Sequence, residues 1–305
     1  MLISSLNGPS LARTIVTSGP MARRAALALL ALWIGATVLA GCTAGGLQGP
    51  TLATTTPAGA PEYIPIQTQK PDGAGPFPAV VIMHDCSGLG PHSSGAPARW
   101  ATELVGRGYV VMMPDSFTTR GFPAGVCTNP SPRRNDVGPS RRVRDAYAAL
   151  AHLRTLPFVD GSRVGLIGGS DGGATTLAAM IASSASPGFR AAVALYPGCA
   201  SWLRSADTYR PAGPLLILIG EKDDWTPAEP CRRLTEASQQ AGGPVTIKIY
   251  PGAYHSFDSA NPVRYVDTRV NASSSTGHGA TAGGDPEAWV DSIREVVAFF
   301  DRYLR

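Results

Sequence analysis

A glycine-rich turn around Ser170 is the strongest structural signal in this chain of 305 residues. The apolar run Arg163–Gly168 leads into Gly-Gly-Ser-Asp-Gly, and the small-residue stretch Gly172–Ser183 follows. The first run predicts a buried strand and the second a helix, so the serine lies at a sharp strand-to-helix turn. Glycine flanks such a residue because a side chain there would hold the strand and the helix apart. The G-x-S-x-G pattern in this setting predicts a nucleophilic serine; the alternative is a glycine-rich turn with an ordinary serine.

Short apolar runs alternate with helical stretches along most of the chain. The strands that we expect are Ala79–His84, Tyr109–Pro114, Arg163–Gly168, Ala191–Tyr196, Pro214–Gly220 and Val245–Tyr250. The helices that we expect are Pro97–Gly106, Ser140–Leu156, Gly172–Ser183, Pro227–Gln240 and Pro286–Leu304. Continuous apolar strands, each followed by a helix, predict an α/β fold with a mostly parallel sheet covered on both faces.

Two further segments complete one domain over residues 61–305. Tyr63–Gln69 alternates between apolar and polar residues, which predicts an antiparallel edge strand. Asn271–Gly284 is polar and rich in small residues, and we expect it to form a mobile surface loop.

A serine hydroxyl is a weak nucleophile and needs a general base. When a serine nucleophile lies in such a turn, an acid and then a histidine follow it along the chain. His255, in YPGAYHSFD, follows the last predicted strand and meets this order. His278 also follows the serine, but it lies in the polar stretch. We therefore expect His255 to be the base.

The acid that orients the base is expected just after the strand Pro214–Gly220. The sequence there is GEKDDWTP, in which Asp223 and Asp224 are adjacent and Glu221 is a third carboxylate near the strand end. The position alone does not choose between the two aspartates. Pro227 is expected to open the next helix, with Thr226 as its N-cap.

Two backbone N–H groups are candidates for an oxyanion hole. One belongs to Asp171 at the start of the helix after the serine. The other lies in HDCSGLG after the strand Ala79–His84, where Cys86 is the first choice and Ser87 the next. Cys86 could alternatively be a nucleophile, but no matching turn surrounds it.

The N-terminal part of the chain resembles an export signal. Arg23 and Arg24 precede the apolar run Ala25–Ala40, and Leu-Ala-Gly-Cys then ends at Cys42. This ending resembles a bacterial lipoprotein signal, in which the cysteine is lipidated. The alternative is a membrane-spanning helix, but the run of 16 residues is shorter than the roughly 20 residues that a span needs.

An exported chain would have two more segments before the domain. Residues 1–42 would form the signal segment, with Met21 as a possible true start, and residues 43–60 a flexible tether rich in Gly, Thr, Ala and Pro. We expect a periplasmic or cell-surface protein that is anchored to a bacterial membrane by its lipid.

Four cysteines remain if Cys42 is lipidated, an even number that suits an oxidising compartment. Because each pair lies in neighbouring segments near strand ends, we expect Cys86–Cys127 and Cys199–Cys231 disulfides. Four free buried thiols are the alternative. The Cys and His spacing indicates no zinc site, and no metal is expected.

The charge balance indicates no nucleic-acid partner. The net charge of the whole chain is +4. Without Arg13, Arg23 and Arg24 of the expected signal segment, 23 basic residues stand against 22 acidic ones, a net of +1. A nearly neutral chain does not predict binding to nucleic acid.

From about Tyr63 to Leu304 the chain resembles the dienelactone hydrolase family of α/β-hydrolases. The segments that carry the resemblance are VVIMHDCSGLG, YVVMMPDSFTTRG, the R-x-x-D-A pattern at Arg142–Ala146, RVGLIGGSDGG, ALYPGC, GEKDDWTP and YPGAYHSFD. The resemblance implies an α/β-hydrolase fold, with Ser170 as nucleophile and His255 as base. It also implies Asp223 as the acid, because the family's acid lies four residues before a proline, here Pro227.

One departure concerns the nucleophile, which is Cys in the namesake enzymes and Ser here. The serine, the export signal and the four cysteines look more like a general esterase branch. We expect hydrolysis of small-molecule carboxylic esters or lactones through an acyl-enzyme, without a cofactor. Arg120, in DSFTTRG, is expected either to bind an acidic group of the substrate or to form a structural ion pair.

Two other functions are compatible with parts of this pattern. One is a serine peptidase of the prolyl-oligopeptidase type, which shares the fold; no segment of the sequence reads as its propeller or large cap domain. The other is a non-catalytic, surface-anchored binding protein, against which the intact set of Ser170, Asp223 and His255 argues.

Overall fold

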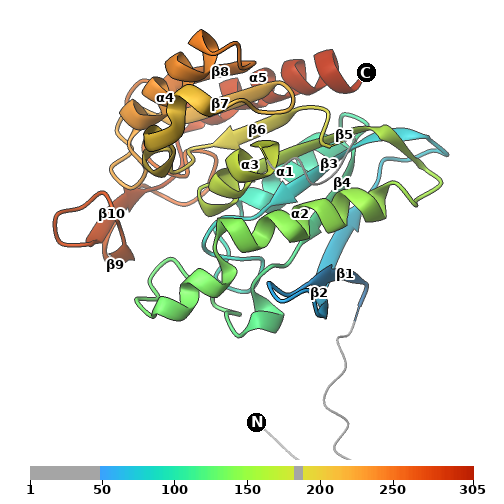
Figure 1. Cartoon of the computed structure of the whole chain (residues 1–305), viewed down its shortest axis with the longest axis horizontal. Helices are drawn as coiled ribbons and strands as arrows, with labels where there is room; N and C mark the ends of the chain where they lie inside the picture. Colours follow the sequence, from blue (N-terminus) through green and yellow to red (C-terminus); the bar gives the residue numbers. More distant parts are fainter. Residues whose placement is uncertain (1–48, 182–187) are drawn as a thin grey trace, which may run out of the picture. The chain divides into compact units, whose positions relative to one another are not determined.

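The computed structural model describes residues 49–181 and 188–305. Within them, the main sheet has eight strands in the order β1-β2-β4-β3-β5-β6-β7-β8 (Figure 1). The strands from β4 to β8 run parallel, whereas β2 is antiparallel to β4, and β1 to β2. The predicted, mostly parallel sheet is confirmed. Its strands are β1 (Thr51–Thr55), β2 (Pro61–Gln69), β3 (Phe77–Met83), β4 (Val110–Pro114), β5 (Val159–Gly169), β6 (Ala192–Leu195), β7 (Leu215–Gly220) and β8 (Val245–Tyr250).

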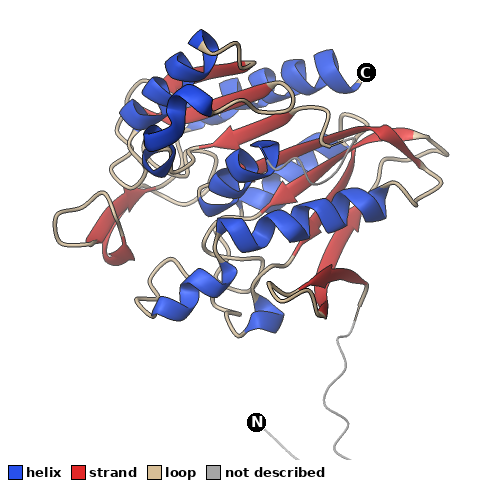
Figure 2. Ribbon diagram, in the orientation of Figure 1, coloured by secondary structure: helices blue, strands red, loops and turns tan. Residues whose placement is uncertain are grey.

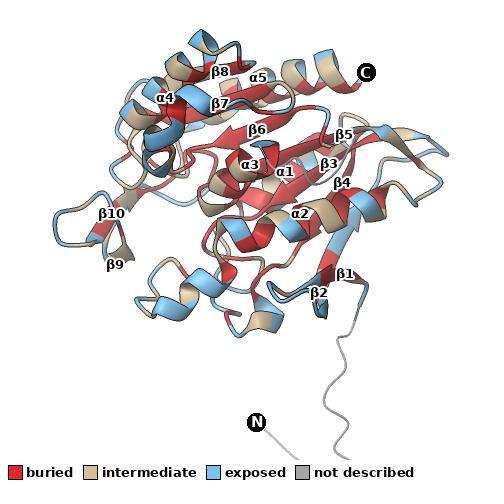
Figure 3. Ribbon diagram, viewed as in Figure 1, coloured by how far each residue is buried: buried red, intermediate tan, exposed pale blue. Residues whose placement is uncertain are grey.

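The central strands are apolar on both faces, which explains their place in the sheet. All residues of β4, β6 and β7 are buried, as are all residues of β3 after Phe77 (Figure 3). A strand with no polar face is stable only when helices cover both of its sides.

Helices provide this cover (Figure 2). α1 and α5 lie on one face of the sheet, and α2, α3 and α4 lie on the other. Each predicted helix is present, with ends shifted by a few residues. The helices are α1 (Ala96–Val105), α2 (Pro139–Leu153), α3 (Asp171–Ile181), α4 (Ala228–Gln240) and α5 (Pro286–Leu304). None of the described helices is long and apolar enough to cross a membrane.

The predicted flexible tether, residues 43–60, is wrong in its second half. Residues 51–55 form β1, which pairs with β2 along its whole length, so that β1 and not β2 lies at the edge of the sheet. Leu52 and Thr54 point inward, and Thr51, Ala53 and Thr55 are more exposed. This alternation is a strand signal that the composition concealed. The signal segment, including Cys42, lies outside the described residues.

The predicted mobile loop at residues 271–284 is also wrong. It contains β10 (His278–Ala282), which pairs with β9 (Arg264–Val270) in an antiparallel hairpin. Side chains and backbone fasten this hairpin to the domain. Trp225 Nε1 donates to the carbonyl of Val270 at 2.8 Å, and Val270 N donates to the carbonyl of Cys127 at 2.9 Å. Asn271 Nδ2 donates to the carbonyl of Asp224 at 3.0 Å.

Both predicted disulfides are present. Cys86–Cys127 joins the loop after β3 to the long connection between β4 and α2. Cys199–Cys231 joins the loop after β6 to α4. Each bridge therefore fixes a loop at the carboxyl edge of the parallel strands, where an α/β sheet carries its binding sites.

Candidate active site

Ser170 occupies the turn between β5 and α3, at the edge where the parallel strands end. Its φ of 54° is in the left-handed region, which a residue with a side chain seldom adopts. The glycines around it allow the turn. A Cβ on Gly168 would lie 2.3 Å from the carbonyl oxygen of Gly172, and a Cβ on Gly172 would lie 2.0 Å from that of Met83. Any side chain at these positions would force α3 away from β5 and β3.

His255, in the loop after β8, reaches Ser170 across the carboxyl edge of the sheet. Ser170 Oγ lies 2.8 Å from His255 Nε2. The imidazole is 1% exposed and packs between the rings of Tyr196 and Trp225, whose centroids are 4.7 Å and 4.8 Å away. The hydroxyl of Tyr196 donates to Asp258 Oδ1 at 2.6 Å, and this bond fixes the Tyr196 ring against the imidazole.

Asp223 holds the other side of the imidazole. His255 Nδ1 lies 2.7 Å from Asp223 Oδ2. Asp223 Oδ1 accepts the backbone N–H groups of Trp225 and Thr226 at 3.0 Å and 2.8 Å. Because a carboxylate only accepts hydrogen bonds, Nδ1 carries the proton, and Nε2 is free to accept one from Ser170.

Thr226 is not the N-cap that the sequence predicts. α4 begins at Ala228, and Pro227 occupies the capping position without a side-chain bond. The hydroxyl of Thr226 instead lies 2.9 Å from Asp223 Oδ2 and 3.0 Å from His255 Nδ1. Asp224 points elsewhere, since its carboxylate accepts the N–H and the hydroxyl of Thr281 in the hairpin, both at 2.8 Å.

The two candidate oxyanion donors belong to two segments that are in contact, the start of α3 and the loop after β3. Within the described residues, the amides of Cys86 and Asp171 donate to no backbone or side-chain acceptor, so both are available to a ligand. The loop that contains Cys86 is firmly held. Asp85 accepts the N–H of Ser87 at 2.7 Å, and Val126 N donates to the carbonyl of Cys86 at 2.7 Å. The sulfur of Cys86 is in a disulfide, which excludes the alternative in which Cys86 is a nucleophile.

A cavity of about 480 Å³ opens beside Ser170 and His255. The hairpin, which sequence reasoning missed, supplies Val266, Arg269 and Ala282 to its lining. Arg269 lies 5.0 Å above the ring of Trp225 and donates to the carbonyl of Ala280 at 2.9 Å. It forms no ion pair with any carboxylate in the described part of the chain. Burial lowers the pKa of Arg269, in the direction expected for a cation that water screens only in part.

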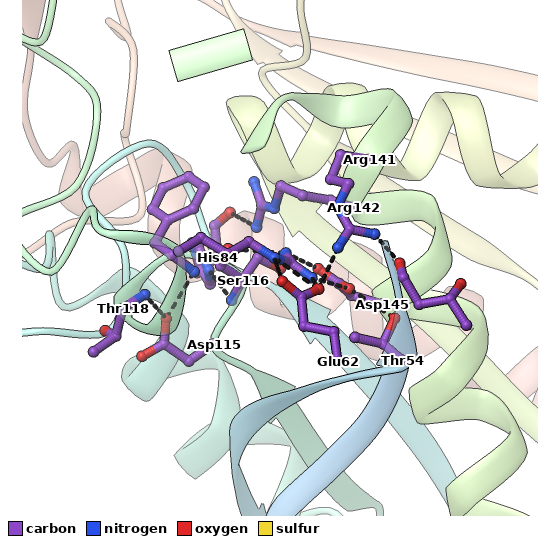
Figure 4. A network of polar contacts seen from close by, with 12 residues as sticks. Thr54, Glu62, His84, Asp115, Ser116, Thr118, Arg141, Arg142 and Asp145 are labelled. Atoms are coloured by element: carbon purple, nitrogen blue, oxygen red, sulfur yellow. Dashed lines mark hydrogen bonds and ion pairs between the residues drawn. The ribbon is translucent and has the colours of Figure 1, made fainter. Parts of the chain in front are cut away.

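Arg120 does not line this cavity, so its predicted role in substrate binding is wrong. Its guanidinium bonds Asp145 at 2.6 Å and 2.8 Å and Glu62 at 2.6 Å, and its side chain is 6% exposed. The structural ion pair, the alternative considered for this residue, is what the structure contains. Figure 4 shows Glu62 and Asp145 in a network of polar contacts.

Metal binding finds little support among the described residues. One group of potential ligands, Asp85, Cys86 and Cys127, is close enough to hold an ion. Two of its three ligand atoms are disulfide sulfurs, which carry no thiolate charge, so the group does not fit a metal.

The mostly parallel sheet, the serine at the strand-to-helix turn and the histidine beside it define an α/β-hydrolase. The model of the dienelactone hydrolase family matches residues 65–304, and the chain belongs to this family. It is therefore a carboxylic ester hydrolase.

Curated relatives and solved structures are similar to this chain. A protein of Methylorubrum extorquens named "Putative carboxymethylenebutenolidase" is 27% identical over 205 residues, which cover 64% of this chain and 68% of the relative. A dienelactone hydrolase-like promiscuous phosphotriesterase from metagenomic libraries superposes with a TM-score of 0.61 at 20% identity, over 84% of this chain and 98% of the other. A dipeptidyl peptidase 4 of Porphyromonas gingivalis superposes with a TM-score of 0.56 at 20% identity, over 83% of this chain and 35% of the peptidase. At such identities the solved structures show a shared fold.

Proposed function

We propose that the chain hydrolyses small carboxylic esters or lactones through a Ser170–His255–Asp223 triad and an acyl-enzyme. The observation that carries this proposal is the unbroken line of contacts from Ser170 Oγ to His255 Nε2, at 2.8 Å, and from His255 Nδ1 to Asp223 Oδ2, at 2.7 Å. Each group has the partner that its role requires: a nucleophile beside a base, and a base oriented by a carboxylate.

The reaction proceeds in two steps. Ser170 Oγ attacks the ester carbonyl while His255 Nε2 takes its proton, and His255 then returns this proton to the departing alcohol. Water next attacks the acyl-enzyme by the same route and releases the acid. The carboxylate of Asp223 stabilises the imidazolium that forms in each step.

The amides of Cys86 and Asp171 would stabilise the negative charge that develops on the carbonyl oxygen. One lies in the disulfide-bonded loop after β3 and the other at the N-terminus of α3, so a covalent bridge and a helix hold them in place. Donors that are fixed in advance need no reorganisation as the charge forms, and each contributes about 3 kcal/mol in comparable sites.

Arg269 supports a preference for substrates with an acidic group. It is a cation in the lining of the cavity, and the ring of Trp225 lies against its guanidinium. It forms no ion pair in the described residues, and the carboxylate of Asp224 acts on it only through the longer-range charge interaction that raises its pKa. A carboxylate on the acyl or alcohol part of the ester would supply an anion bonded directly to the guanidinium. The sequence assigned this task to Arg120, which Glu62 and Asp145 already neutralise.

Ser170→Ala tests the proposal directly. Its expected result is loss of at least about 10⁴-fold in kcat for short-chain chromogenic esters, with an unchanged melting temperature. A fluorophosphonate probe should label the wild type at Ser170 and leave the variant unlabelled. Retained ester cleavage in the variant would refute the assignment of the nucleophile.

Cleavage of aminoacyl anilides in preference to esters would support the peptidase alternative. A wild type that neither reacts with the probe nor cleaves esters would support a binding protein.

A further inference from the structure

Arg142, the first residue of the R-x-x-D-A pattern, carries a positive charge in the interior of the domain. It lies on α2 and its side chain is 0% exposed. Its Nη1 donates to Asp171 Oδ2 at 2.7 Å, and its Nη2 donates to the carbonyl oxygen of His84 at 2.5 Å. The guanidinium lies 5.0 Å from the ring centroid of Phe117, and its Nε has no partner in the described residues.

The two partners of Arg142 belong to the two segments that hold the candidate oxyanion amides. Asp171 itself contributes one amide. His84 directly follows β3 and lies two residues before Cys86, which contributes the other. Arg142 therefore connects, through one planar group, the start of α3 with the end of β3. Figure 4 shows Arg142 and His84 in one network of polar contacts.

These two segments also touch without any side chain between them. A Cβ on Gly172 would lie 2.0 Å from the carbonyl oxygen of Met83 and 2.7 Å from that of His84. The spacing of β3 and α3 thus depends on a backbone-to-backbone contact, which resists closer approach but does not prevent separation. The bonds of Arg142 to both sides of this contact oppose separation.

Stability alone gives a weak reason for a buried arginine here. Removing a guanidinium from water is costly, and an apolar side chain of similar volume is often equally stabilising. The unpaired Nε increases that cost. His84 adds no competing charge, since burial and the nearby Arg142 keep the pKa of its imidazole well below the usual range. The arginine provides two directed hydrogen bonds at a fixed separation, which an apolar residue cannot provide.

We propose that Arg142 is a positioning residue that sets the separation of the Cys86 and Asp171 amides and so completes the oxyanion hole. This inference rests on the function proposed above. Arg142 touches neither the nucleophile nor the cavity, so it acts through the two segments that it joins.

Arg141 provides a matched control. It is the preceding residue of the same helix, it is 7% exposed, and it bonds one carboxylate and one backbone carbonyl, as Arg142 does. Its partners, however, are Glu62 of β2 and the carbonyl of Thr55 in β1, at the edge of the sheet away from Ser170. Substitution of either arginine disturbs the bonds of a buried guanidinium to a carboxylate and a carbonyl, but only the bonds of Arg142 involve the oxyanion segments.

The test compares Arg142→Lys with Arg141→Lys in the full chain. Lysine keeps the charge but presents a single point in place of a planar fork, and so cannot make both bonds at once. For Arg142→Lys, kcat for a short-chain ester should fall at least about ten-fold while KM changes less than about two-fold. The inhibition constant of an alkyl boronic acid, which places an oxygen in the oxyanion hole, should rise by the same factor. Arg141→Lys should lower the melting temperature and leave kcat and the boronic acid constant within about two-fold.

Asp171→Asn is the second variant, should Arg142→Lys not fold. It keeps the amide N–H and removes the charge that holds Arg142, so the same split between kcat and KM is expected, with a smaller loss. A folded Arg142→Lys or Asp171→Asn protein with wild-type kcat and wild-type boronic acid affinity would overturn the proposal. So would equal losses of kcat in the Arg141 and Arg142 variants. Because fluorophosphonate labelling of Ser170 is scored in every variant, failure of the triad itself is seen separately, in the wild type.

Discussion

At the residue scale, the adjacent carboxylates of Asp223 and Asp224 have different partners. Asp223 is 4% exposed, and its two oxygens are divided between His255 and the amides that follow it in the turn. Asp224 points outward and fastens Thr281 of the hairpin. Successive residues of a tight turn point in opposite directions, so identical side chains reach different partners. The different contacts of the two aspartates therefore follow from the geometry of the turn and not from the residue type.

Asp223→Asn should lower kcat by about 10⁴-fold with little effect on folding. An amide can hold the imidazole in the wrong tautomer, with its proton on Nε2, where it cannot accept the proton of Ser170. Steady-state kinetics with a chromogenic ester measures the effect. Asp224→Asn is the matched control and should retain kcat within about three-fold, because its contacts are to the hairpin. Equal losses in the two variants would contradict the assignment of the acid.

Arg269→Gln should raise KM for an ester with a free carboxylate and leave a neutral ester of the same size unaffected. A charged hydrogen bond contributes about 1.5–3 kcal/mol, and since Arg269 is half-buried, a loss of about ten-fold in kcat/KM for the anionic ester is expected. The measurement is the ratio of kcat/KM for the two esters in each protein. An unchanged ratio would remove Arg269 from substrate recognition.

At the scale of elements, a cluster of charges holds β1 and β2 against α2. Glu62 of β2 accepts bonds from Arg120 and Arg141, and Asp145 of α2 accepts bonds from Arg120 and Thr54. Two cations and two anions compensate each other with little water present, so removal of one leaves its partner unpaired. The cluster explains why a strand as short as β1 remains in place.

Glu62→Gln should therefore destabilise the domain in a pH-dependent way. Hydrogen bonds from Arg120, with the charges of Arg120 and Arg141, hold the pKa of Glu62 below its usual range. A lowered folded-state pKa stabilises the fold above the ordinary glutamate pKa of about 4.3, and this stabilisation is lost as the pH falls from there through the folded-state value.

The variant should lose about 2 kcal/mol of unfolding free energy at pH 7 relative to the wild type, and the difference should shrink below about pH 4. Urea denaturation at several pH values measures it. Glu103→Gln, in a partly exposed pair with Arg107, should change stability by about 0–1 kcal/mol at any pH. A pH-independent difference for Glu62→Gln would mean that ionisation of this residue does not stabilise the fold.

Elements differ in how well the sequence predicts them, and burial is the reason. β3 and β7 were predictable because a strand buried on both faces is an unbroken apolar run. β1 and β9 are only partly covered, so tertiary contacts to Arg141 and Trp225 stabilise them more than their own residues do. The run RYVDTRV of β9 is rich in β-branched and aromatic residues, a strand signal that sequence reasoning overlooked.

At the scale of the whole molecule, the candidate site combines segments that are far apart in sequence. The turn around Ser170 is a local pattern, and chain order then restricts the candidate base to His255 and the candidate acid to two aspartates. The family resemblance selects Asp223, so the sequence predicts three residues that lie in contact in the structure. Arg269 and Arg142 were not assigned to the site, because their roles depend on contacts across the fold: Arg269 lies on the overlooked hairpin, and Arg142 meets Asp171 and His84 from a different helix. The substrate-binding role considered for Arg120 was wrong for the same reason, since its partners Glu62 and Asp145 are distant in the sequence and no local pattern predicts these contacts.

We propose that the molecule is exported and lipid-anchored. This proposal makes one prediction for Cys42, the site of lipidation, and another for the four cysteines of the two disulfides. The disulfides Cys86–Cys127 and Cys199–Cys231 span 41 and 32 residues, and such bridges persist in oxidising compartments. In a bacterial host, Cys42→Ser should move the protein from the membrane fraction to the soluble periplasmic fraction, because the acyl chains that would hold it are no longer attached. Its kcat should be unchanged.

A chain without residues 1–42 would remain in the cytosol with its four thiols reduced. It should be less stable by about 3–4 kcal/mol for each missing bridge, as expected for loops of this length. Fractionation with immunodetection measures the location, and alkylation of free thiols followed by mass spectrometry measures the bridges. Membrane retention of the Cys42→Ser protein would contradict lipid anchoring. Bridges that form fully in the reducing cytosol would show that the fold itself, and not the compartment, determines the oxidation state of the cysteines.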